Sequence, residues 1–411
     1  MNEVIAGLDI GTSKVSIVIG EINEGDDLQV IGIGTSPCSG VKKGMVVDID
    51  NTIVAIVSAL EQAETMSNVK ITGVYVNMSG GDVQFIRNKG LISISGQDRE
   101  ISHEHIYKVM EAAKTVDVMP GGQIIDVLPV QYIVDGYDRI LDPVGMVGSR
   151  LELEADVIIC PITTINTIER CVKNAGLETR GLVIESLATG SSVLTKDEKE
   201  LGCVLVNVGA GKTELGIFKK GVLKYTGYIP VGGNNISNDL SIGLNIDFKL
   251  ADEIKKTYGL VEVDPASGRS TGVSSSNHNQ SYDLDICRAR EIMQARVQEM
   301  FALIKYEIED SGYHDIAGSR IVLTGGGLAM LSGAAQVGEE ILGQGFRIGR
   351  PAYIGATSPI YSLAVGLVKY MYEKQGLGSP SVGRRARYNS NKKKKMPVFA
   401  NKIKQIFSDF F

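Results

Sequence analysis

Three glycine-bearing turns, each directly after a short apolar segment, carry most of the residues that could do chemistry in this 411-residue chain. Glycine lets backbone amides approach phosphate oxygens, because no Cβ intervenes and positive φ is allowed. A single turn of this kind is usually only a tight hairpin. Three of them in one chain predict a phosphate-binding site. Their members are Gly11, Thr12, Ser13 and Lys14; Gly209, Ala210, Gly211, Lys212 and Thr213; and Gly325, Gly326 and Gly327.

Polar side chains stand directly before or within these turns. Asp9 precedes the first turn and could hold Mg²⁺ through its water shell. Asn207 precedes the second turn, where it could accept a hydrogen bond from metal-bound water but adds no charge. Lys212 either replaces part of the metal's charge or points to solvent. Glu185, at the end of a predicted strand, either positions an attacking water or lies beside a helix start at a hinge.

A fourth candidate, Gly232 and Gly233, leads into a predicted helix at 235–242. The amino terminus of a helix presents unpaired amides and favours anions. We therefore expect these two glycines to join the same phosphate site.

Paired apolar strands must position the turns. Segments 4–10 and 15–19 flank the first turn, and 203–208 and 214–219 flank the second, about 200 residues later. Each set predicts a strand–turn–strand unit, and the repetition predicts two similarly built halves. Between them, 81–160 reads as a compact β-rich module around one helix.

Local sequence patterns predict three further segments in the second half of the chain. Segment 288–310 reads as a long helix, 359–372 as a helix of small residues, and 265–281, rich in Ser, Gly and Asn, as a loop. Five scattered cysteines predict neither disulfides nor a metal site. No apolar run is long enough to predict a membrane-spanning helix, and the acidic, strand-like start predicts no signal peptide.

Charge divides the chain unequally. The net charge is −6, but residues 380–411 hold nine basic side chains and one acid, so the body carries about −14 and the tail about +8. At 100° per residue, six large apolar side chains of 396–411 fall on one arc of about 140°. Aromatics opposite lysines favour an interfacial membrane anchor over a helix docked on protein, and phenylalanines at this spacing disfavour nucleic acid. The apolar face comprises Phe399, Ile403, Ile406, Phe407, Phe410 and Phe411, with Lys402 and Lys404 opposite.

The order and spacing of these turns resemble the actin-type ATPases, and within them the FtsA family of bacterial division proteins. Segments 7–15 and 251–259, the inserted module and the tail all match that family. The resemblance implies an α/β, actin-like two-domain ATPase fold with a small inserted α+β subdomain, 1C or SHS2-like, and a carboxyl-terminal amphipathic helix. The implied parts are subdomain 1A at 1–80, 161–197 and 347–375; 1C at 81–160; 2A at 198–233 and 315–346; 2B at 234–314; a disordered basic linker at 376–395; and the helix at 396–411.

The resemblance also implies function. ATP and Mg²⁺ would bind between the halves, with Asp252 and Lys255 facing the nucleoside, and hydrolysis would be weak or absent because Asn207 stands where the family usually has Asp. The implied partners are the FtsZ carboxyl-terminal peptide on 2B, further copies of the chain in a filament, anionic lipid and other division proteins. The place would be the cytoplasmic face of the membrane at the septum. The alternatives are a PilM-like cytoplasmic scaffold and a small-molecule kinase of the same superfamily.

Overall fold

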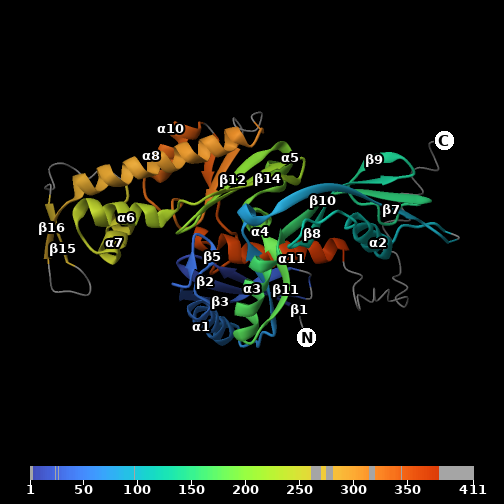
Figure 1. The fold of residues 1–411 in the computed structure, drawn as a ribbon, viewed down its shortest axis with the longest axis horizontal. Helices are drawn as coiled ribbons and strands as arrows, with labels where there is room; N and C mark the ends of the chain where they lie inside the picture. Colours follow the sequence, from blue (N-terminus) through green and yellow to red (C-terminus); the bar gives the residue numbers. More distant parts are fainter. Residues whose placement is uncertain are drawn as a thin grey trace, which may run out of the picture. The chain divides into compact units, whose positions relative to one another are not determined.

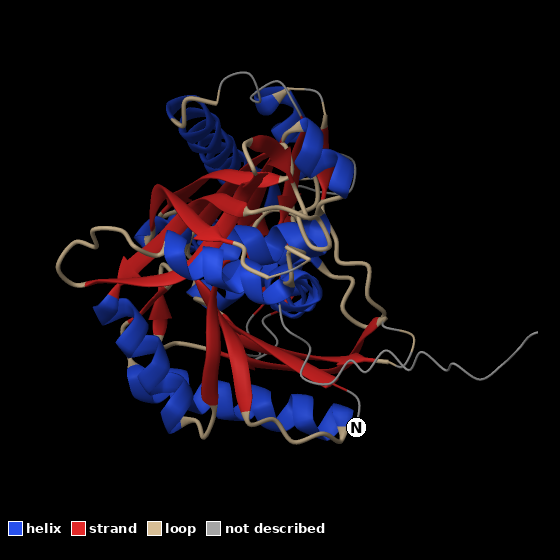
Figure 2. Ribbon diagram, turned by 90° about the vertical axis from the view of Figure 1, so that its right-hand side faces the viewer, coloured by secondary structure: helices blue, strands red, loops and turns tan. Residues whose placement is uncertain are grey.

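The computed structural model of this chain describes residues 3–378, except 24, 26, 97, 261–269, 275–280, 314–319 and 344. Residues up to Gly378 form one compact unit. Strands and helices are both abundant within it (Figure 2), which confirms the predicted α/β class. The predicted tail helix at 396–411 lies outside the described residues.

The first of the two large sheets contains the first glycine turn. Its strand order is β11-β6-β1-β2-β3, with β1 and β2 antiparallel and β6 parallel to β1. Helices α1 and α3 pack together beside this sheet, and α11 packs against β1 (Figure 1). The bounds are β1 Glu3–Ile10, β2 Lys14–Ile22, β3 Leu28–Pro37, β6 Gly73–Met78, β11 Glu178–Ile184, α1 Ile49–Ser67, α3 Ile162–Asn174 and α11 Ser362–Gly378.

The second large sheet repeats this plan, which confirms the prediction of two similar halves. Its order is β14-β13-β12-β17-β18, with β12 and β13 antiparallel around the second glycine turn and β17 parallel to β12. The third glycine turn directly follows β17. The bounds are β12 Cys203–Val208, β13 Thr213–Lys219, β14 Val222–Ile229, β17 Arg320–Thr324 and β18 Phe346–Ile348.

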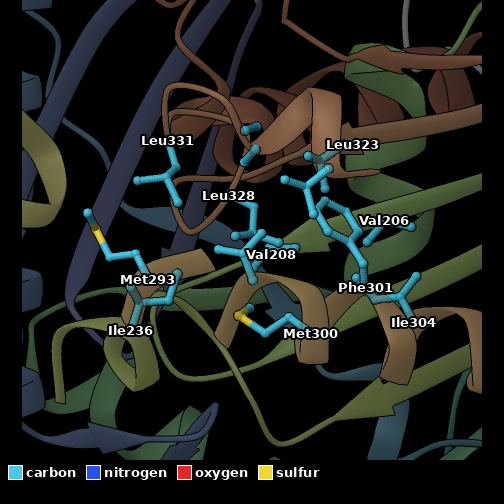
Figure 3. Close-up of a cluster of buried hydrophobic side chains, with 14 of the residues drawn as sticks. Val206, Val208, Ile236, Met293, Met300, Phe301, Ile304, Leu323, Leu328 and Leu331 are labelled. Carbon is cyan, nitrogen blue, oxygen red and sulfur yellow. The ribbon is translucent and has the colours of Figure 1, made fainter. Parts of the chain in front are cut away.

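Helices cover one face of this second sheet and form the largest apolar cluster. Phe301 of α8 belongs to this cluster (Figure 3) and is fully buried, with its ring edge-on to that of Phe346 at a centroid distance of 6.0 Å. The predicted long helix is therefore confirmed, and its apolar stripe holds it against the sheet. The bounds are α6 Gly233–Leu244, α7 Phe248–Tyr258, α8 Ile286–Asp310 and α10 Ala334–Leu342.

The β-rich module predicted at 81–160 is present as a separate four-stranded sheet with its own apolar core. The order is β7-β10-β8-β9, and α2 packs against β7 and β10. The bounds are β7 Gln84–Ser93, α2 His103–Ala113, β8 Gly122–Val134, β9 Tyr137–Ile140 and β10 Arg150–Pro161. Short elements elsewhere in the chain connect the sheets and helices described above. They are β4 Val41–Lys42, β5 Met45–Val46, η1 Gly80–Asp82, α4 Glu185–Val193, α5 Lys196–Leu201 and η3 Pro359–Tyr361.

Three sequence predictions need correction. The segment read as a loop holds a hairpin, β15 Ser270–Ser274 with β16 Ser281–Asp285, because the two strands pair with each other. Helix α11 continues to Gly378, so the first three residues of the predicted linker 376–395 are helical. Glu185 begins helix α4 and does not end a strand.

Candidate functional site

The three glycine turns meet at one cavity of about 370 Å³. The amide of Gly233 donates to the carbonyl of Gly209 (2.9 Å), and the amide of Gly327 donates to the carbonyl of Val208 (2.8 Å). Only glycine fits at 327, because a Cβ there would stand 2.4 Å from the Gly209 carbonyl oxygen. These contacts join the second turn, the third turn and the start of α6 to one another.

Most of the residues predicted from sequence line this cavity. Thr213 and Gly232 do not: the Thr213 hydroxyl donates to the Val231 carbonyl, and Gly232 caps α6. Those that line it are Asp9, Gly11, Thr12, Ser13, Lys14, Glu185, Asn207, Gly209, Ala210, Gly211, Lys212, Gly233, Asp252, Lys255, Gly325, Gly326 and Gly327.

Sequence reasoning missed some lining residues, chiefly Glu214, Asn234 and Lys256. Asn234 directly follows the predicted glycine pair, and Lys256 directly follows Lys255 on the same helix. Both could have been predicted from their position beside a predicted site residue. Glu214 is the second residue of β13 and nearly fully buried. Alternation along the strand could have placed its side chain on the cavity side.

Three buried charged side chains, Lys212, Glu185 and Glu214, form a cluster in the cavity lining, and we call this part of the lining the cavity floor. The Lys212 ammonium donates to Glu185 Oε1 (2.9 Å) and Glu214 Oε1 (2.6 Å). Burial alone lowers the pKa of Lys212, but the two carboxylates outweigh it and the pKa is raised, so the side chain stays protonated. Lys212 is 8% exposed, and the predicted alternative in which it points to solvent is therefore wrong.

The carboxylates of this cluster are held by the first half of the molecule. Asn77 on β6 donates to Glu185 Oε1 (2.8 Å) and accepts from the amide of Ile10 (2.8 Å). Glu214 accepts from the Ser79 hydroxyl and the Gly80 amide. The cluster therefore joins the two sheets across the cavity.

Asp9 and Lys14 complete the ionisable groups on the side of the first turn. Burial raises the pKa of Asp9 to about 7, with the charge of Lys14 opposing the shift and that of Glu185 adding to it. The Lys14 ammonium donates to the Ile360 carbonyl (2.8 Å) and lies 4.7 Å from the centre of the Tyr361 ring. Lys14 thus connects the first turn to the segment that leads into α11.

A second polar network lies on α6 and α7. The Lys255 ammonium donates to Asp252 (2.6 Å), the Ser237 hydroxyl (2.7 Å) and the Gly233 carbonyl (3.0 Å). Burial alone raises the pKa of Asp252, but hydrogen bonds from Lys255 and Lys256 lower it to about 2. An ionised carboxylate at this position can accept hydrogen bonds from a ligand's hydroxyl groups.

The donor set fits a triphosphate with a hard cation. Residues of the three glycine turns line one cavity with Lys14, Lys212 and Lys255, which supplies the glycine backbone and positive charge that phosphate binding requires. The predicted anion site at the start of α6 is not free, because the amides of Gly233 and Asn234 donate to the carbonyls of Gly209 and Ala210. Asp9 and Asn207 offer oxygen atoms, the ligands that Mg²⁺ prefers. Within the described part of the chain, no three His, Cys, Asp or Glu side chains come together to hold a metal ion unaided.

Two halves of like topology around a glycine-lined cavity define the class: the chain has an actin-like fold. It resembles MreB5 of Spiroplasma citri bound to AMPPNP (TM-score 0.53, 14% identity, 91% of this chain and 97% of that chain). It also resembles a chain of the PilM–PilN type IV pilus biogenesis complex (TM-score 0.60, 16% identity, 89% of this chain and 97% of that chain).

Sequence comparison then identifies the family. A family model described as cell division protein FtsA matches residues 204–366, and one described as the SHS2 domain inserted in FtsA matches 80–159. The FtsA proteins of Pseudomonas aeruginosa (35% identity, 95% of each chain) and Bacillus subtilis (37%, 93% of this chain and 86% of that one) are similar throughout. The chain belongs to the FtsA family of cell division proteins.

Proposed function

We propose that this chain is an ATP-binding, filament-forming adaptor that tethers FtsZ filaments to the inner face of the cytoplasmic membrane at the septum. The observation that carries the proposal is that three glycine turns, with buried Lys212 and Lys255, line one cavity in an FtsA-family chain. Filament contacts and further division partners are proposed from the family alone.

In this proposal the turn amides and Lys14 bind the phosphates, and Asp252 and Lys255 lie on the nucleoside side. Asp9 and Asn207 would hold Mg²⁺ through water, and the ion would neutralise phosphate charge. Both halves contact the same cavity, so bound ATP favours their closed arrangement and, through it, assembly with further copies.

Hydrolysis of ATP is expected to be slow, about 10⁻² s⁻¹ or less. Asn207 adds no charge beside the metal, and Glu185 already accepts hydrogen bonds from Asn77 and Lys212. Measured phosphate release should rise at least about tenfold in Asn207→Asp. The control Asn234→Asp adds the same charge to the same cavity lining and should not raise it. Wild-type turnover of about 1 s⁻¹ or faster would contradict this prediction.

The membrane anchor is proposed from sequence, because 379–411 lie outside the described residues. Among the described residues, no helix combines the length and apolar character needed to cross a bilayer. Burying phenylalanines at about 1.5–3 kcal/mol each, with about 1 kcal/mol per nearby lysine at an anionic leaflet, would suffice for peripheral binding.

Sedimentation with vesicles that contain anionic lipid tests the anchor. The intact chain should sediment, and a chain ending at Lys395 should remain in the supernatant. Replacing Phe407 and Phe410 with serine should weaken binding at least about 100-fold, since two buried aromatic side chains are lost. Replacing Gln405 and Ser408 with alanine on the opposite face is the matched control. Equal sedimentation of the intact and shortened chains would contradict the anchor and favour a scaffold of the PilM kind.

The FtsZ peptide is proposed to bind within 234–314, where α8 carries four basic side chains, Arg288, Arg290, Arg296 and Lys305. Arg296 is engaged in ion pairs with Asp239 and Glu299. We therefore assign the recognition of an acidic peptide to the other three.

The alternative function, a small-molecule kinase, has no support among the described residues. Each acidic side chain that lines the cavity already has one of the roles given above, so none is left to act as the base for a substrate hydroxyl.

A further inference from the structure

We propose that Lys212 is a tethered cation that takes over part of the charge of a divalent metal, so that ATP binds with little dependence on Mg²⁺. This inference rests on the proposed binding of ATP in the same cavity. It concerns what the residues of this chain do when the metal is withheld.

The fold carries the Lys212 ammonium to the cavity floor and keeps it there. The residue lies in the turn between β12 and β13, lines the cavity, and is 8% exposed. Gly44 covers it: a Cβ on Gly44 would stand 2.8 Å from Lys212 Cδ. The ring of Tyr228 lies 5.8 Å from the ammonium. A side chain packed in this way loses little further entropy when a ligand binds.

Two carboxylates fix the position of this charge. Glu185 and Glu214 accept from the ammonium at 2.9 and 2.6 Å, and each is itself held by residues of the first half. The ammonium therefore cannot swing away as an exposed lysine would. A cation held in advance stabilises an arriving anion without reorganisation.

The balance of charge at the floor explains why this cation matters. Three buried acidic side chains, Asp9, Glu185 and Glu214, line the cavity together with two buried lysines, Lys212 and Lys255, and Lys255 is already paired with Asp252. Without Lys212 this lining would be more negative, and a metal-free triphosphate would meet greater repulsion. With Lys212 present that repulsion falls, and a divalent ion entering beside it gains less, because like charges repel.

The test measures the dissociation constant of ATP for the full chain, by calorimetry, with excess Mg²⁺ and with EDTA. For the wild type, the EDTA and Mg²⁺ values should differ by less than about fivefold. For Lys212→Gln the ratio should rise to about 100-fold, since one buried charge near the phosphates is lost. Lys212→Arg should retain the low ratio.

Lys256→Gln is the matched control, because Lys256 also lines the cavity but is an exposed partner of Asp252. It should leave the ratio near the wild-type value. A wild-type ratio above about 100-fold, or equal ratios in wild type and Lys212→Gln, would overturn the inference alone. Failure to bind ATP in either buffer would overturn the proposed function with it. The wild-type ratio needs no variant, so the test stands even if Lys212→Gln does not fold.

Discussion

Gly327→Ala is expected to abolish ATP binding and to cost about 3 kcal/mol of stability. The added Cβ would stand 2.4 Å from the Gly209 carbonyl oxygen and 2.7 Å from Val208 Cγ1. Neither a backbone oxygen nor a fully buried valine can retreat easily. The Gly209 carbonyl also accepts the amide of Gly233, so its displacement would disturb the start of α6 as well.

The neighbouring Gly326→Ala is the control for the stability measurement. Its Cβ would meet only Ile360 Cγ2, at 3.2 Å, which is the end of a side chain that can shift. Urea unfolding should therefore move by less than about 1 kcal/mol in this variant. If Gly327→Ala left both the free energy of unfolding and the ATP affinity unchanged, the close contacts between the glycine turns would not be what shapes the site.

The glycine turns could be predicted from sequence because their signals are local. An apolar strand, a glycine and a second strand define each hairpin without reference to the rest of the chain. Their meeting point could not be derived in that way. It depends on the contact of Gly327 with Gly209 and of Gly233 with Gly327, between residues far apart in the sequence.

Helix α4 shows why one element was missed. Eight of its nine residues are buried, so it has no polar face and no periodic pattern to reveal it. Its neighbour α11 approaches so closely that a Cβ on Gly366 would stand 2.0 Å from the Ala188 carbonyl oxygen. Small residues on both helices permit this contact. As a result, Glu185 was read as the end of a strand when it begins a helix.

The orientation of the Lys212 side chain also could not be predicted from the sequence. Its two partners are Glu185, 27 residues earlier on another element, and Glu214, two residues later in β13. A lysine in a glycine-rich loop gives no sign of which carboxylates will surround it. Only the tertiary packing brings Glu185 within hydrogen-bonding distance of Lys212 and buries all three side chains.

Lys212→Met is expected to destabilise the folded chain by about 3–5 kcal/mol, because removing one partner leaves buried charges without compensation. Glu185 and Glu214 would then lie close together without the ammonium that they share, and the cavity lining would be more negative. Urea unfolding at neutral pH measures this loss. The pair Lys212→Met with Glu214→Gln should recover about half of it, since one of the two stranded charges is also removed.

The matched control for this stability prediction is Lys256→Met, at an exposed position whose partner Asp252 keeps its contact with Lys255. Its cost should stay below about 1 kcal/mol, as for other surface ion pairs. Equal costs for Lys212→Met and Lys256→Met would contradict the buried cluster. A double variant less stable than Lys212→Met would contradict the repulsion between the carboxylates. If both expectations hold, the charge that holds Glu185 and Glu214 together at the cavity floor is supplied by the chain itself.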